Sequence, residues 1–180
     1  MQAWQSDMKW SDKFLPEIKR YLGEYLICAA PTEEDAERNT DLIVLKLDAV
    51  RIACRIRRNN YLIRYPYEFT IRSGRPSGIK TELTKIIEGW GDYFFYGFSN
   101  ESETELEVWR LCSLNVFRLW FNRQIVNTKK TPGIEKTNGD NSSSFHAFDI
   151  RDLPGEFVIA SRFHEPGMRE SNRTIDIVPS

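Results

Sequence analysis

Apolar and polar positions along the chain recur with two different periods, and each period predicts a type of secondary structure. Between residues 11 and 28, apolar side chains recur near the helical period, and Ser11 or Asp12 can cap this predicted helix. Helical spacing returns at residues 79–90 and 115–126. Runs rich in branched and aromatic residues instead predict strands at residues 41–47, 50–58, 67–73, 92–98, 106–114, 145–153 and 156–161.

The segment TDLIVLKLDAVRIACRIRR, residues 40–58, predicts a pair of neighbouring strands joined by a tight connection. Side chains of a strand point alternately to its two faces, so Ile52, Cys54 and Ile56 share one face. Arg55 and Arg57 fall on the other face, with Arg51 and Ala53.

Two further segments carry clear local signals. Thr81 is placed to cap the helix at residues 79–90, and Gly89 or Gly91 to end it. The run DYFFYGF, residues 92–98, offers aromatic side chains on both faces of a strand. The longer run WGDYFFYGF, residues 90–98, would suit base stacking, but an aromatic strand of this kind predicts core packing in preference to it.

Together these elements predict one mixed α/β domain over residues 1–165, with a central mixed sheet flanked by helices. The polar stretch at residues 127–144 contains glycine and proline and predicts a long flexible loop. Residues 166–180 are expected to form a C-terminal tail.

The composition predicts the compartment in which the protein is found. Hydrophobic residues make up 41% of the 180-residue chain and charged residues 28%, which is typical of a soluble protein. The chain has neither an apolar run of the roughly 20 residues needed to cross a bilayer nor an apolar signal segment at its start. Its three cysteines show no CxxC spacing, so buried thiols in a reducing compartment are expected. These features predict a cytoplasmic protein without a membrane partner.

Charge is segregated along the chain although the net charge is only −1. Residues 46–80 contain nine basic residues and two acids, whereas residues 82–107 contain seven acids and one lysine. A basic segment of this kind indicates a surface that binds a polyanion. The alternative is that the two blocks neutralise each other across the folded surface.

The arginines of the second strand need partners, because burying unpaired charge is costly. They can pair with acids among residues 33–41, or they can face a phosphate backbone, which suits the planar guanidinium fork. The loop SGRPSG, residues 73–78, would extend the same surface. The candidate nucleic-acid-binding residues are Arg51, Arg55, Arg57, Arg58, Arg72, Arg75 and Lys80.

The order helix, strand, strand, strand, helix, strand over residues 12–98, together with Asp41, resembles the core of the PD-(D/E)XK nuclease-like superfamily. The resemblance implies a restriction-endonuclease-like fold, in which an acid opening one strand and an acid-x-lysine motif on the next hold Mg²⁺. Asp41 matches the first acid. The motif position falls on Arg55-Ile56-Arg57, and arginine neither coordinates Mg²⁺ nor acts as a base.

A displaced site would restore the metal. In this hypothesis Asp41 and Glu82 bind Mg²⁺, and Lys85 lies near the attacking water. Glu17 on the first helix is a further candidate acid. The alternative for Glu82 and Lys85 is an exposed pair on one helical face. For Asp41, the alternative is an acid that caps a turn.

These observations predict a DNA-binding protein of nuclease-like fold. It either cuts DNA with a displaced Mg²⁺ site or binds DNA without cutting it. The alternative function is a non-enzymatic accessory protein, of the phage or defence kind, whose arginine face binds an acidic protein. An unrelated small hydrolase is a third class, but the sequence offers no nucleophile constellation for it.

Overall fold

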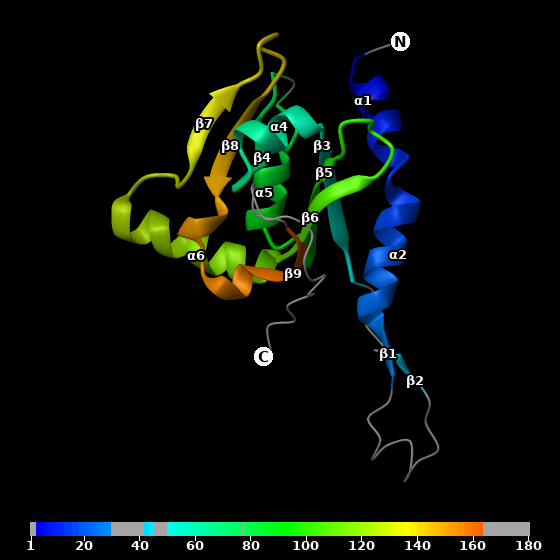
Figure 1. The fold of residues 1–180 in the computed structure, drawn as a ribbon. Coiled ribbons are helices and arrows are strands. Elements are labelled where there is room, and N and C mark those ends of the chain that lie inside the picture. Colours follow the sequence, from blue (N-terminus) through cyan, green and yellow to red (C-terminus); the bar gives the residue numbers. More distant parts are fainter. Residues whose placement is uncertain (1–2, 30–41, 45–49, 77, 164–180) are drawn as a thin grey trace. The chain divides into compact units, whose positions relative to one another are not determined.

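A computed structural model describes residues 3–29, 42–44, 50–76 and 78–163 of the chain. The chain divides into two compact units, residues 1–50 and residues 51–180, and each is described by itself (Figure 1). Within the described ranges, none of the helices has the length and apolar character that crossing a membrane requires. The predicted tail at residues 166–180 lies outside the described residues.

The first unit contains two helices and a short strand pair. Helices α1 (Ala3–Asp12) and α2 (Leu15–Leu26) replace the single helix predicted over residues 11–28. Phe14, Ile18 and Tyr21 are buried at helical spacing, which accounts for the periodicity seen in the sequence. Pro16 is the second residue of α2, in the first turn where a missing N–H costs little.

Strand β2 (Leu42–Val44) corrects one predicted pairing. It pairs antiparallel with β1 (Ile27–Ala29), with Ile27 opposite Val44, and not with the strand that follows it. The run at residues 40–58 is therefore not a hairpin, because its two strands belong to different sheets.

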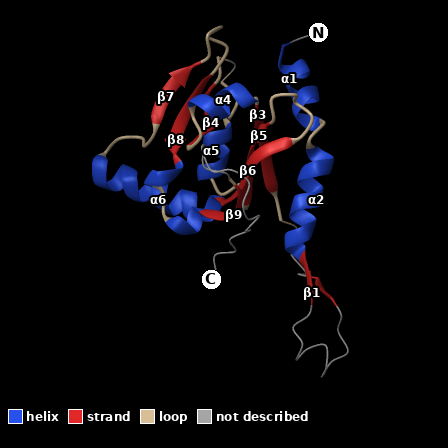
Figure 2. Cartoon of the chain, in the orientation of Figure 1, coloured by secondary structure: helices blue, strands red, loops and turns tan. Residues whose placement is uncertain are grey.

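The second unit has two sheets, distinguished from the helices in Figure 2. The larger has the strand order β3-β5-β6-β9 and is formed by β3 (Ile52–Arg57), β5 (Tyr93–Ser99), β6 (Leu106–Ser113) and β9 (Val158–Arg162). Strands β3 and β5 are parallel, whereas β5, β6 and β9 are antiparallel neighbours. The smaller, antiparallel sheet has the order β4-β8-β7 and is formed by β4 (Glu68–Gly74), β7 (Ile134–Thr137) and β8 (Ser144–Asp149).

Helices form part of the connections between these strands. The crossover from β3 to β5 contains α4 (Asn59–Arg64), β4 and α5 (Glu82–Ile87). Helix α6 (Leu114–Thr128) follows β6, and the 3-10 turns η1 (Ile150–Asp152) and η2 (Gly155–Phe157) precede β9. Parallel strands require a crossover of this kind, so the pairing of β3 with β5 fixes where α5 lies.

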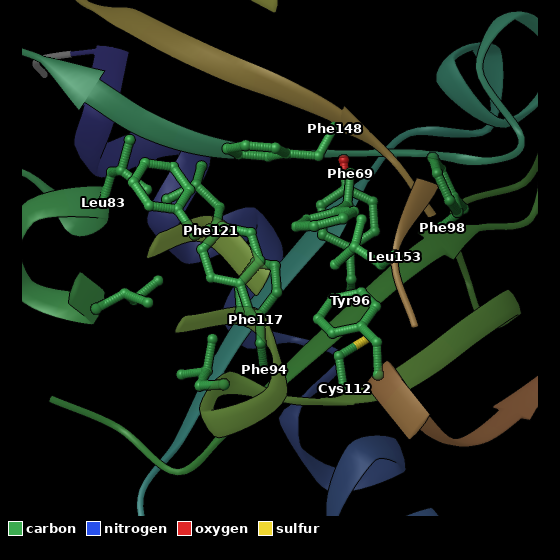
Figure 3. Close-up of a cluster of buried hydrophobic side chains, with 14 of the residues drawn as sticks. Phe69, Leu83, Phe94, Tyr96, Phe98, Cys112, Phe117, Phe121, Phe148 and Leu153 are labelled. Atoms are coloured by element: carbon green, nitrogen blue, oxygen red, sulfur yellow. The ribbon is translucent and has the colours of Figure 1, made fainter. Parts of the chain in front are cut away.

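The core of the second unit is aromatic and is shared by both sheets and two helices. Figure 3 shows Phe69 and Phe148 of the smaller sheet facing Phe117 and Phe121 of α6. Phe69 stacks on Phe148 with ring centroids 5.3 Å apart. Phe94 of β5 is fully buried in the same cluster, so the aromatic strand forms core, as predicted.

Helix α4 and strand β7 also differ from the prediction. Helix α4 was not predicted, because its six residues are too few to show a period and Arg58 provides no side-chain cap. Strand β7 lies inside residues 127–144, so the prediction of a loop is wrong over Ile134–Thr137. The mixed α/β class itself is confirmed, while the restriction-endonuclease-like core stays a prediction.

Candidate nucleic-acid interface

A cleft of about 520 Å³ opens beside β3, β4 and α5. Its lining, called the basic cleft below, consists of Arg51, Ile52, Ala53, Arg55, Arg72, Arg75, Lys80, Glu82, Lys85, Ile86, Trp90, Gly91 and Leu114. Six of these residues are basic, and Glu82 is the one acid among them. The volume falls within the range of about 300–1,000 Å³ typical of ligand sites.

The outer position of β3 explains how arginines reach this cleft. Register places Ala53 beside Phe94 and Arg55 beside Tyr96, so the arginine face of β3 continues the aromatic face of β5. Phe94 and Tyr96 lie deep in the core, but β3 ends the strand order, and a long side chain there can reach solvent. The predicted alternation along β3 therefore holds, with the arginines at the margin of the core.

Glu82 contacts the side chain of Arg55 and the backbone of Arg72. Its carboxylate forms an ion pair with Arg55 and accepts a hydrogen bond from the backbone N–H of Arg72 at 3.2 Å. Thr81 caps α5, since its side chain accepts a hydrogen bond from the Thr84 N–H, and this cap fixes where Glu82 starts the helix. The acids at residues 33–41, expected as partners of the arginines, lie outside the described residues.

Positive charge is crowded around Arg72. Partial burial lowers the pKa of its guanidinium, and the charges of Arg55 and Arg75 lower that pKa further. Glu82 acts in the opposite direction and raises it. One carboxylate is therefore shared among several cations, and the cleft keeps a surplus of positive charge.

The other cations stand at the exposed side of the cleft. Arg51, Arg75, Lys80 and Lys85 are all exposed. The Lys80 ammonium donates to both oxygens of Glu88 at 2.7 and 2.8 Å, which neutralises part of its charge. The backbone of Arg51 is fixed, because its N–H donates to the Asp92 carboxylate at 2.8 Å.

Two of the predicted binding residues do not line the cleft. The Arg57 guanidinium lies over the ring of Tyr61 on α4, 3.9 Å from its centroid. Arg58 forms an ion pair with Glu103 at 3.1 Å. The structure thus brings Arg51, Arg55, Arg72, Arg75 and Lys80 together at one cleft and places Arg57 and Arg58 elsewhere.

Trp90 is a cleft residue that the sequence interpretation did not single out. Its side chain is 64% exposed, although tryptophan is usually largely buried. It lies between Gly89 and Gly91, whose φ angles are +99° and +79°. The Gly-Trp-Gly pattern is the signal that could have identified it, because it sets a large ring in a turn where the neighbouring backbone needs glycine.

The described residues contain no cluster of side chains that would hold Mg²⁺. Asp41 lies outside the described residues, so its distance from Glu82 is not defined. Among the described residues, no three potential metal-ligating side chains are grouped together. Mg²⁺ binds several oxygen ligands, and the carboxylate that reaches the cleft, Glu82, is already bound to Arg55.

A second hollow, of about 400 Å³, lies in the same unit between α6 and β8. Its lining, called the acidic hollow below, consists of Trp120, Gln124, Pro132, Gly133, Phe148, Asp149 and Asp152. Hydrogen bonds from Arg151 lower the pKa of the Asp149 carboxyl. Asp149 is paired with Arg151 at 2.6 Å.

Comparison with known proteins identifies no relative of the chain. The chain matches no protein-family model, no curated protein and no solved structure. Function is therefore inferred from the residues of the basic cleft.

Proposed function

We propose that the protein binds nucleic acid through the basic cleft. The observation that carries this proposal is the lining itself, with six cations around one acid that is already bound by arginine. A phosphate backbone supplies the compensating negative charge, and its paired oxygens suit guanidinium groups. DNA is the first ligand to test.

The energetics of the cluster support a functional role. Burial is the main cause of the lowered pKa of Arg72, and repulsion by the neighbouring charges of Arg55 and Arg75 lowers that pKa further. A polyanion would relieve the repulsion when it binds. Crowded cations that cost stability in the free protein are expected where binding requires them.

The test is a titration of labelled DNA at several salt concentrations. The cleft variant carries Arg51→Gln, Arg75→Gln and Lys85→Gln, which change exposed side chains only. The control variant carries Arg64→Gln, Arg123→Gln and Lys130→Gln, which remove the same charge from exposed positions outside the cleft lining. We expect the cleft variant to bind DNA about tenfold or more weakly. The slope of log K against log salt should fall by about 0.7–0.9 for each phosphate that the variant no longer neutralises.

Equal losses of affinity in the two variants would show non-specific attraction and contradict the assignment to the cleft. Absence of binding at low salt would overturn the proposal and leave the acidic protein partner as the alternative.

The nuclease hypothesis is tested in the same reactions with added Mg²⁺ or Mn²⁺. Because Glu82 is bound by Arg55, we propose binding without cutting. Cleavage that disappears in both Asp41→Ala and Glu82→Ala would replace this proposal with the displaced metal site.

A further inference from the structure

We propose that the basic cleft takes single-stranded nucleic acid, with one base stacked on the indole of Trp90. This inference rests on the proposed function and names the form of its ligand. Three features of the cleft carry it: the exposed indole, the fixed turn that holds it and the limited volume beside it.

The indole is available to a ligand. Trp90 lines the cleft together with Arg75 and Lys85, and 64% of its surface is exposed. An exposed aromatic ring beside cations is the combination by which proteins bind single strands, since the ring takes a base and the cations take the phosphates. An acidic protein would use the cations but has no general need for the ring.

The turn that carries Trp90 is held by hydrogen bonds on both sides. Its backbone N–H donates to the carbonyl of Lys85 at 3.0 Å. The Arg118 guanidinium of α6 donates to the carbonyls of Ile86 and Gly91 at 3.3 and 3.1 Å. A ring on a fixed backbone loses less conformational freedom when a base stacks on it, so the geometry is prepared for binding.

The space beside the ring distinguishes the forms of nucleic acid. In a double helix the bases are stacked on one another, and their faces are not accessible to a protein ring unless a base leaves the stack. The major groove of B-DNA alone is about 12 Å wide, so a duplex would lie over the mouth of a 520 Å³ cleft. A single strand can enter it and turn a base face toward Trp90.

The experiment compares three ligands of equal length: a single-stranded oligothymidine, an abasic sugar-phosphate strand and a duplex. Each is titrated against the full chain and against Trp90→Leu and Trp90→Phe. Leucine keeps an apolar side chain without an aromatic face, whereas phenylalanine keeps the face. Thermal unfolding of each variant verifies that the fold is retained.

We expect Trp90→Leu to weaken binding of the oligothymidine by roughly 5- to 100-fold, and Trp90→Phe to restore most of that affinity. The same leucine variant should bind the abasic strand and the duplex as the unchanged protein does, within about twofold. This pattern ties the effect to stacking between ring and base.

Two other results would overturn the inference in distinguishable ways. If all three ligands bind and Trp90→Leu changes none of them, or changes all equally, nucleic-acid binding stands and base stacking on Trp90 is wrong. If no ligand binds at low salt, the proposed function is wrong and this inference fails with it.

Discussion

The basic cleft and the acidic hollow are similar in size but opposite in chemistry. Their volumes are about 520 and 400 Å³, and each contains a tryptophan. In the acidic hollow, Trp120 is partly buried against the aromatic core and packs edge-on against Phe148, with 6.2 Å between the ring centroids. Trp90 of the cleft remains 64% exposed. The two hollows therefore differ in charge and in the exposure of their tryptophan, and these differences, not volume, are why we propose the basic cleft as the binding site.

The largest effect is expected when the charge of each hollow is changed. Arg75→Glu with Lys85→Glu puts two acids into the cleft, and we expect DNA affinity to fall on the order of 100-fold because each change replaces attraction by repulsion. Asp149→Asn with Asp152→Asn in the acidic hollow should change affinity by less than about twofold. Fluorescence anisotropy at one fixed salt concentration measures both, and similar effects in the two variants would remove the distinction between the hollows.

Glu82→Gln separates stability from binding within the cleft. The side chains of Arg55 and Glu82 are 20% and 26% exposed, so loss of this ion pair should cost about 1–3 kcal/mol of unfolding free energy, less than for a fully buried pair. Because the one acid of the lining is neutralised, DNA affinity should rise several-fold. Chemical denaturation and anisotropy give the two quantities. A variant with lower affinity as well as lower stability would contradict this expectation and show that the position of Arg55 matters more for binding than the negative charge of Glu82.

The smallest effect is expected at the acidic hollow. The pair of Asp149 with Arg151 should contribute only slightly to stability at pH 7, and Asp149→Asn would remove this contribution while keeping a residue that can cap η1. Arg151 lowers the pKa of Asp149 in the folded state. The contribution is therefore present above the unfolded pKa of about 3.9, and it disappears as pH falls through the folded pKa.

Unfolding of Asp149→Asn and the unchanged protein at pH 7 and near pH 2 measures this difference. A difference that persists at the acid end would assign it to packing and not to charge.

Local signals in the sequence predicted elements well and pairings poorly. Alternation at residues 50–58 gave the two faces of β3, and Thr81 and Gly89 marked the two ends of α5 correctly. The partner of β3 is β5, with about forty residues between Ile52 and Tyr93, and no local pattern encodes a pairing over that separation. The two strands within residues 40–58 were predicted as a pair because they are neighbours in the sequence, but they belong to different sheets.

In the candidate site too, local features could be predicted from the sequence, whereas contacts between distant residues could not. The excess of basic residues before Lys80 predicted a cationic surface, and five of the seven named residues line one cleft. The role of Glu82 in holding Arg55 could not be predicted, because it depends on how α5 lies against β3. Strand β7 was missed because its side chains are largely exposed, which removes the alternation that identifies a strand.

Because the crossover between β3 and β5 forms most of the basic cleft, the cleft can change during evolution separately from the rest of the fold. Apart from Leu114, every residue lining the basic cleft lies between Arg51 and Gly91, a single continuous piece of chain. Most of the aromatic core lies after this piece, in β5, β6, α6 and β8. Mutations, insertions or recombination within this piece can therefore alter what the cleft recognises while the scaffold that supports it is inherited unchanged.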